Sequence, residues 1–182
     1  MRAKMATMKA PVLVPVEEYL RTSYRPDCDY VDGEVLERNA GEHDHSDLQT
    51  ELAYYFRSRR KQWRLHAVVE QRVQVKQNRF RIPDICVMRG GGPYPPIFRE
   101  PPFICIEVLS KDDTLLSTQK RIDDYLNFGV PYVWVFDPID RRVWTYSADG
   151  NKEVKDGVLR TKNPSIEVLL SEVFAGLDDA RA

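Results

Sequence analysis

The sequence contains little cysteine and no long apolar run. Its three cysteines, Cys28, Cys86 and Cys105, form no CxxC pair and lack the Cys/His spacing of a zinc site. No 18 consecutive residues are apolar, and the first dozen residues lack the apolar stretch of a signal peptide. We therefore expect a cytoplasmic protein with reduced thiols and no membrane partner.

The sequence also lacks an excess of charge of one sign. Its 27 basic and 28 acidic residues give a net charge of -1, which argues against a histone-like polycation but leaves room for a local basic groove. No GxSxG motif occurs, and Cys86 and Cys105 lie inside apolar runs, so a serine or cysteine hydrolase is disfavoured. The 182 residues suit a single α/β domain, which we expect to span residues 1–182.

Hydrophobic periodicity predicts the elements of the N-terminal half. Residues 15–22 favour a short helix, and residues 29–39 favour two strands around a turn at Asp32-Gly33. Residues 44–62 predict an amphipathic helix with Asp44 as its N-cap, and helical spacing places His45 at the start of its buried stripe. Residues 66–76 alternate between apolar and polar, which predicts one half-buried strand.

Strands dominate the C-terminal half. They are expected at residues 80–88, 103–110, 132–138 and 141–147. A glycine- and proline-rich loop separates the first two, and the tail favours a hairpin and a short helix. Residues 114–129 predict a helix that ends at Gly129, with a buried stripe of Leu115, Ile122, Tyr125 and Leu126. The elements together predict an α/β fold with a central sheet flanked by helices.

Two of these strand segments, RIPDICVM and FICIEVLS, each carry one carboxylate among apolar residues. An isolated charged carboxylate is costly to bury, so it protonates, pairs with a cation or binds a metal ion. The strands of Asp84 and Glu107 are joined by a single loop, so we expect them to be neighbours and their carboxylates to converge. Oxygen ligands without thiols favour Mg²⁺ or Mn²⁺. The alternative is that each acid is solvated or pairs with an arginine such as Arg81 or Arg121.

The order of short motifs along the chain resembles a known family. Pro83-Asp84 followed by Glu107-Val108-Leu109 resembles the PD-(D/E)XK, or restriction endonuclease-like, nuclease superfamily. DGE at 32–34, the helix that begins near His45, EVLS at 107–110 and GVPYVWVFDP at 129–138 resemble its Uma-type (Uma-two) branch. The resemblance covers about residues 14–147 as a core, with residues 148–182 as a C-terminal extension.

This resemblance implies a restriction endonuclease-like core, a mixed sheet flanked by helices, that cuts DNA with the help of Mg²⁺ or Mn²⁺. It implies Asp84 and Glu107 as metal ligands, Glu34 as a candidate third ligand, and His45 as a residue that orients water or contacts a phosphate. The alternative for His45, of equal weight, is that it only caps its helix. The alternative for Glu34, which is slightly favoured, is that it is an exposed acid after a turn. The superfamily often pairs subunits to cut two strands, so a homodimer is expected.

One position departs from the superfamily pattern. A lysine normally follows the glutamate by two residues, but position 109 is leucine, which cannot bind a phosphate. The branch moves this lysine to the next helix, four residues before a tyrosine, which corresponds here to Arg121, with Lys120 beside it. Helical phase aims Arg121 better at the sheet, although only lysine can readily exchange a proton with water. Lys111 is a weaker candidate.

The expected activity is therefore metal-assisted hydrolysis of phosphodiester bonds in DNA. The segment RSRRKQWR at residues 57–64 offers positive charge that could attract the nucleic-acid backbone, or could merely keep a helix end soluble. Because Leu109 replaces the motif lysine, the alternative function is a catalytically inactive nuclease-fold module that binds nucleic acid or a protein.

Overall fold

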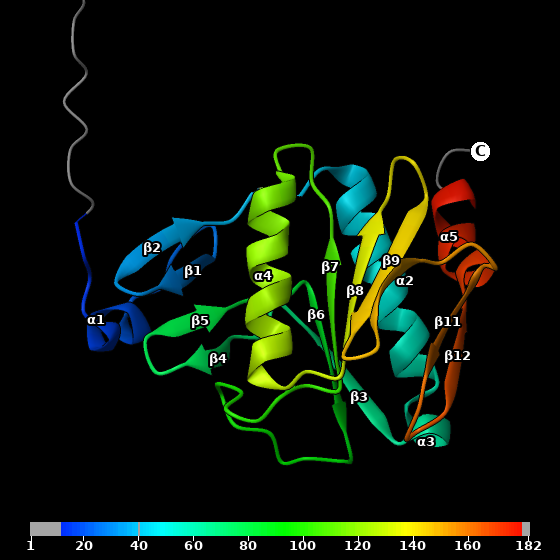
Figure 1. Ribbon diagram of the computed structural model, residues 1–182, viewed down its shortest axis with the longest axis horizontal. Helices are drawn as coiled ribbons and strands as arrows, with labels where there is room; N and C mark the ends of the chain where they lie inside the picture. Colours follow the sequence, from blue (N-terminus) through cyan, green and yellow to red (C-terminus); the bar gives the residue numbers. More distant parts are fainter. Residues whose placement is uncertain (1–11, 40, 180–182) are drawn as a thin grey trace, which may run out of the picture.

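A six-stranded mixed sheet forms the centre of the protein, whose computed structural model describes residues 12–39 and 41–179 (Figure 1). The strand order is β10-β9-β8-β7-β6-β3, and only the β7–β8 pair is parallel. The strands are β3 (Leu65–Val69), β6 (Ile85–Arg89), β7 (Ile104–Val108), β8 (Tyr132–Asp137), β9 (Arg142–Ser147) and β10 (Gly150–Glu153). This mixed α/β architecture confirms the predicted fold class.

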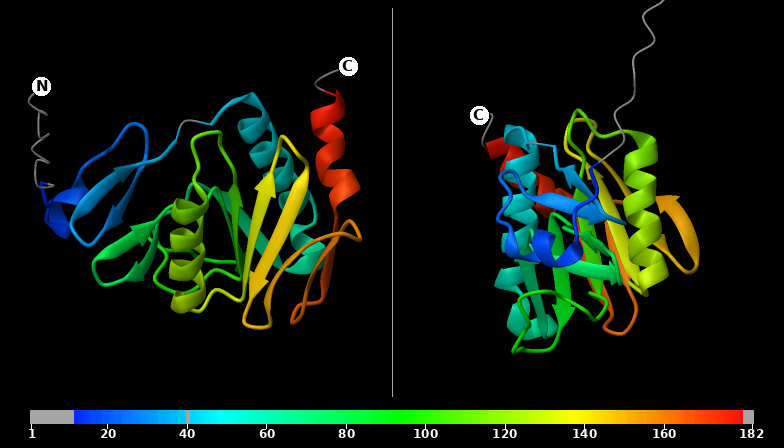
Figure 2. Two further views of the ribbon diagram at one scale, coloured as in Figure 1. Left: turned by 45° about the horizontal axis from the view of Figure 1, so that its top comes forward. Right: turned by 90° about the vertical axis from the view of Figure 1, so that its left-hand side faces the viewer.

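Helices cover both faces of this sheet because its central strands are apolar on both sides. Helices α2 (His43–Ser58) and α5 (Leu170–Asp179) cover one face, and α4 (Leu115–Phe128) covers the other, as two views show (Figure 2). Alternate residues of β7 divide accordingly: Ile104 and Ile106 pack on the α2 side, and Cys105 packs on the α4 side. A four-residue helix, α3 (Arg60–Trp63), follows α2.

A second sheet of four antiparallel strands lies beside the first, at the left of Figure 1. Its order is β2-β1-β5-β4, from β1 (Cys28–Val31), β2 (Glu34–Glu37), β4 (Val73–Lys76) and β5 (Arg79–Arg81). We call it the small sheet. Helix α1 (Val16–Arg21) packs on it through Tyr19, whose ring contacts Tyr30 and Phe80.

The C-terminal segment joins the main core. The hairpin of β11 (Val158–Thr161) and β12 (Ile166–Leu169) places Leu159 and Val168 in the same apolar cluster as Leu52 of α2. No helix among the described residues is both long and apolar enough to cross a membrane.

The prediction of a single strand over residues 66–76 is wrong. The segment divides into β3 and β4, which belong to different sheets, because Glu70 adopts a positive φ of 50° and turns the chain. Residues 80–88 divide in the same way into β5 and β6 at Pro83, which has no N–H for a strand ladder. Asp84 therefore directly precedes β6 and does not lie within a strand.

Two details of the predicted helices are also wrong. Helix α2 begins at His43 with Glu42 as N-cap, so Asp44 lies in the first turn. Leu115 is 87% exposed although the periodicity predicts burial. The first turn of α4 borders a cavity instead of the sheet, because Thr114, Leu116 and Ser117 line that cavity. The predicted strand pair at residues 29–39 and the end of α4 at Gly129 are confirmed.

Candidate functional site

Two neighbouring strands bring Asp84 and Glu107 together. Strands β6 and β7 pair with Ile85 opposite Ile106, so one further step of the same register places Asp84 opposite Glu107. Asp84 Oδ2 accepts a hydrogen bond of 2.7 Å from the backbone N–H of Val108, directly after Glu107. Both acids are buried, each with 2% of its surface exposed.

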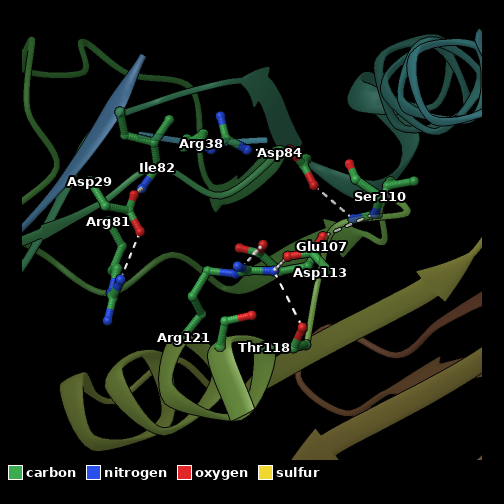
Figure 3. A network of polar contacts seen from close by, with 12 residues as sticks. Asp29, Arg38, Arg81, Ile82, Asp84, Glu107, Ser110, Asp113, Thr118 and Arg121 are labelled. Atoms are coloured by element: carbon green, nitrogen blue, oxygen red, sulfur yellow. Dashed lines mark hydrogen bonds and ion pairs between the residues drawn. The ribbon is translucent and has the colours of Figure 1, made fainter. Parts of the chain in front are cut away.

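The two carboxylates lie at the bottom of a cavity of about 480 Å³ between the small sheet, the loop that precedes α4 and the first turns of α4. Six residues singled out in the sequence line this cavity: Glu34, His45, Asp84, Glu107, Lys120 and Arg121. Figure 3 shows how the side chains of Asp84, Glu107, Arg38 and Arg121 gather around one space.

Asp84 is held by charged and polar partners from two other elements. Its Oδ1 atom forms an ion pair with Arg38, which follows β2 in the small sheet. His45 Nε2 of α2 lies 3.6 Å from the same oxygen, and His45 Nδ1 lies 3.2 Å from Ser110 Oγ. The imidazole therefore bridges Asp84 and the loop after β7.

Glu107 is held by α4. The Tyr125 hydroxyl donates a hydrogen bond of 2.6 Å to Glu107 Oε1. Arg121 Nε lies 2.8 Å from Glu107 Oε2, but this buried N–H has no aligned hydrogen-bond acceptor. The same guanidinium donates from Nη2 to Asp113 Oδ1 at 2.9 Å. Glu107 thus pairs with Arg121, which is the alternative that the sequence offered for this acid.

The electrostatics reflect two buried carboxylates that lie close together. The pKa of Glu107 is raised to about 7 in all, because burial outweighs the opposing charge of Arg121. The charge of Asp84 adds to the rise, whereas Arg38 and the Tyr125 hydrogen bond oppose it. Burial alone would lower the pKa of Arg38 and of Arg121. The carboxylates beside them outweigh that effect and raise both pKa values above the usual range, so both guanidiniums stay charged.

The other predicted residues are placed differently. Lys120 is exposed at the cavity, and among residues 12–39 and 41–179 it has no ion-pair or hydrogen-bond partner. Glu34 is half-buried at the cavity wall. Lys111 points elsewhere and pairs with Glu42. Leu109 packs among apolar residues on the α4 side of the sheet, so position 109 supplies no positively charged side chain in place of the motif lysine.

The basic segment at residues 57–64 lies far from this cavity. Strand β3 runs from Leu65, opposite Arg89, to Val69, opposite Ile85. The acids lie at the Val69 end of the sheet, whereas the basic segment precedes Leu65 at the other end. It therefore does not line the cavity.

A hard divalent cation fits the donor set at this site. Mg²⁺ commonly uses one or two carboxylates and completes its shell with water and substrate phosphate. One oxygen of each acid is fixed by a neutral donor, Val108 N–H or Tyr125 O–H, which leaves Asp84 Oδ1 and Glu107 Oε2. The unaligned Arg121 Nε shows that the guanidinium is an imperfect partner for Glu107 Oε2. Within the described part of the chain, no three His, Cys, Asp or Glu side chains form a ready metal cluster, so Glu34 does not join the two acids.

Four residues of this site were not found from the sequence. Arg38 and Asp113 lie in segments without a recognisable motif, and Ser110 was noted only as part of EVLS. Tyr125 was assigned to the apolar stripe, and its burial is correct, but its hydroxyl bonds Glu107. A tyrosine on a helix face that packs against a strand with a buried acid is the one signal that could have identified a site residue.

The comparisons with known proteins agree with this architecture. The model of the Uma2 family, described as putative restriction endonuclease, matches residues 16–180. A solved structure of a putative nuclease belonging to DUF820 from Anabaena variabilis ATCC 29413 superposes with a TM-score of 0.76 at 23% identity. The match covers 90% of this chain and 99% of that one, and at this identity it shows the shared fold. No curated protein matches the chain.

Proposed function

The chain belongs to the Uma2 family of putative restriction endonucleases, and on this premise we propose that it is a metal-dependent endonuclease that hydrolyses phosphodiester bonds in DNA. The observation that carries the proposal is the convergence of two buried acids, Asp84 and Glu107, at the bottom of an open cavity. A buried acid with a raised pKa, as Glu107 has, in a cavity that it shares with a second buried acid is more typical of a functional site than of a structural one.

Asp84 Oδ1 and Glu107 Oε2, which pair with Arg38 and Arg121, would hold the cation, since the other oxygen of each acid is fixed by a neutral donor. Mg²⁺ or Mn²⁺ in this position would activate water and polarise a phosphate. Tyr125 and the Val108 N–H keep the two carboxylates in fixed orientations, which reduces the rearrangement needed when a ligand binds.

The cationic side chains of α4 suit a phosphate group. Lys120 is unpaired within the described ranges and exposed at the cavity, so its ammonium is available to a DNA phosphate. Arg121 stays charged and presents a planar guanidinium. We assign both to the stabilisation of negative charge that develops on the phosphate. His45, bonded to Ser110, orients the polar groups around Asp84.

The second candidate function is a non-catalytic module that binds nucleic acid or a protein. The observation that favours it is that each acid has its own guanidinium, Arg38 for Asp84 and Arg121 for Glu107. Such a protein would bind its partner equally well with and without Mg²⁺ and would show no turnover. A homodimer that cuts both strands stays a prediction, which sedimentation velocity would check.

Plasmid cleavage separates the two functions. We expect wild-type protein to nick or linearise plasmid DNA in Mg²⁺ or Mn²⁺ and to stop when EDTA is added. Asp84→Asn should lower the rate by about 1000-fold, because one of two cation ligands is lost. Asp123→Asn is the matched control, since Asp123 is exposed on α4 and bonds only Gln119 among the described residues.

Three results would contradict the proposal. Cleavage that persists in EDTA would exclude the metal, and cleavage that persists in Asp84→Asn would exclude this cavity. The non-catalytic module would be favoured if a homogeneous preparation binds DNA without cleaving it, and if its affinity for DNA does not depend on Mg²⁺ or Mn²⁺. Circular dichroism of each variant shows whether the fold is retained.

A further inference from the structure

Two arginines that line the cavity pair with the buried acids and are more exposed than they are. The side chains of Arg38 and Arg121 are 20% and 17% exposed, whereas those of Asp84 and Glu107 are 2% and 3% exposed. The arginines come from different parts of the fold: Arg38 follows a strand of the small sheet, and Arg121 belongs to α4. They therefore reach the acids from separate elements (Figure 3).

These two arginines balance the charge of the acids. When both acids are ionised, Asp84 and Glu107 carry two negative charges, and Arg38 and Arg121 carry two positive charges. A divalent cation on the same carboxylate oxygens would add two positive charges within a few ångströms of both guanidiniums. Such repulsion is strong between charges that are largely buried. The cation and the two guanidiniums therefore compete for the same oxygens.

The cavity has room for the guanidiniums of Arg38 and Arg121 after they dissociate from the acids. Both line the cavity, as does Lys120. Arg121 keeps its 2.9 Å hydrogen bond to Asp113, which anchors it beside the site. A guanidinium matches the geometry of a phosphate with two parallel hydrogen bonds. Once released, the two arginines and Lys120 would form a set of three cations that face an incoming phosphate.

We propose that Arg38 and Arg121 are exchangeable counterions, which neutralise Asp84 and Glu107 in the absence of a divalent cation and bind nucleic-acid phosphate when the cation replaces them. This inference rests on the proposed function and adds to it a coupling between cation binding and phosphate binding. The cation releases the phosphate ligands, and the phosphate holds the arginines away from the acids. Thermodynamic linkage then requires that each ligand raise the affinity for the other by the same factor.

The first measurement is calorimetric titration of Mg²⁺ into the full-length protein without nucleic acid. Arg38→Gln removes a competitor for Asp84 Oδ1, so we expect Mg²⁺ to bind about 3- to 10-fold more tightly than to wild type. Arg38→Lys retains a counterion and should stay close to wild type. Arg160→Gln is the matched control, because it removes the same charge from an exposed pair with Asp156 and Glu167.

The second measurement is the affinity for a short DNA duplex by fluorescence anisotropy, in EDTA and in Ca²⁺, which takes the same oxygen ligands. Wild type should gain about 10-fold in affinity from the cation, within the usual range for coupled sites. Arg38→Gln and Arg121→Gln should gain about 3-fold or less, because a phosphate ligand is missing.

These results also separate the inference from the function on which it rests. Suppose that wild type cleaves DNA with Mg²⁺ but that a folded Arg38→Gln variant binds Mg²⁺ no more tightly than wild type. The proposed counterion exchange is then wrong, and the proposed nuclease function is retained. A gain in DNA affinity from Ca²⁺ that is equal in all variants would also overturn the exchange. If neither wild type nor Arg38→Gln binds Mg²⁺, both the function and the exchange fail.

Discussion

Two clusters of buried ions lie close together in this protein, and they differ in how completely their acids are bonded. We call Asp29, Arg79, Arg81 and Asp124 the inner cluster, and Asp84, Glu107, Arg38 and Arg121 the cavity cluster. In the inner cluster all four carboxylate oxygens accept hydrogen bonds, from Ile82 N, Arg79 Nη1 and Arg81 Nη1 and Nε, at 2.7–3.0 Å. In the cavity cluster the one partner of Glu107 Oε2 among the described residues is the unaligned Arg121 Nε.

The difference separates a structural role from a role in binding. The inner cluster ties β1 and β5 of the small sheet to α4, and full bonding offsets the cost of burying its charges. The cavity cluster lies beside open space and has an acid whose charged form is disfavoured. A site that is to exchange ligands cannot have all its oxygens permanently bonded. The predictions below test this contrast.

The largest expected effect is on stability, from Asp124→Ala in the inner cluster. It removes an acid that is bonded to both Arg79 and Arg81, and it leaves a buried guanidinium short of a partner. We expect a loss of about 3–5 kcal/mol in the free energy of unfolding, measured by urea denaturation. The control Asp123→Ala, one residue away and exposed, should cost less than about 1 kcal/mol. Equal losses of unfolding free energy in the two variants would contradict a structural role of the inner cluster.

The next effect is a pH dependence that arises in the cavity cluster. The pKa of Glu107 is about 7 in the folded protein against an ordinary value of 4.5. The folded state therefore holds a proton that the unfolded state releases, so the stability contributed by Glu107 is lost as pH rises from about 4.5 to about 7. The full change is about 3 kcal/mol, at about 1.4 kcal/mol for each pKa unit.

Glu107→Gln cannot titrate at this position, so it provides the reference. In EDTA, the unfolding free energy of wild type minus that of Glu107→Gln should decrease between pH 5 and pH 8. The subtraction removes the titrations that both proteins share. Parallel pH profiles would show that Glu107 keeps an ordinary pKa and that the two clusters do not differ in this respect.

The smallest effect in free energy is expected from Lys120→Gln. Lys120 has no partner among the described residues, so the unfolding free energy should change by less than about 0.5 kcal/mol. The cleavage rate should fall by about 10- to 100-fold, since a cation next to the phosphate is lost. Lys120→Arg should restore most of the rate. A variant with unchanged cleavage would leave Arg121 and Arg38 as the phosphate-binding cations.

Much of the fold was predictable because its signals are local. The apolar runs of β7 and β8 and the glycine at the end of α4 specify these elements without tertiary information. The proximity of Asp84 and Glu107 follows from two strands joined by a single loop. By contrast, the break between β3 and β4 depends on Glu70, which adopts a positive φ without a glycine or proline to signal it.

The parts of the site that were missed depend on contacts between distant segments. Arg38 reaches Asp84 across 46 residues and from another sheet, and no periodicity encodes such a pair. The helical phase of α4 did distinguish Arg121, which contacts Glu107, from the exposed Lys120. It could not predict that Leu115 is exposed, because the exposure depends on how the first turn of α4 lies relative to the rest of the fold.

The hydrogen bond from Val108 N–H to Asp84 makes this carboxylate an acceptor at the end of the strand ladder as well as a partner of Arg38. An asparagine here has only one carbonyl oxygen, and the Val108 amide would claim it. Its NH₂ group would then face the Arg38 guanidinium. Both groups are hydrogen-bond donors, so they could not bond to each other. Asparagine at position 84 would thus present hydrogen-bond donors where aspartate presents an acceptor. The substitution nearly conserves the shape of the side chain, but it does not conserve its interaction with Arg38.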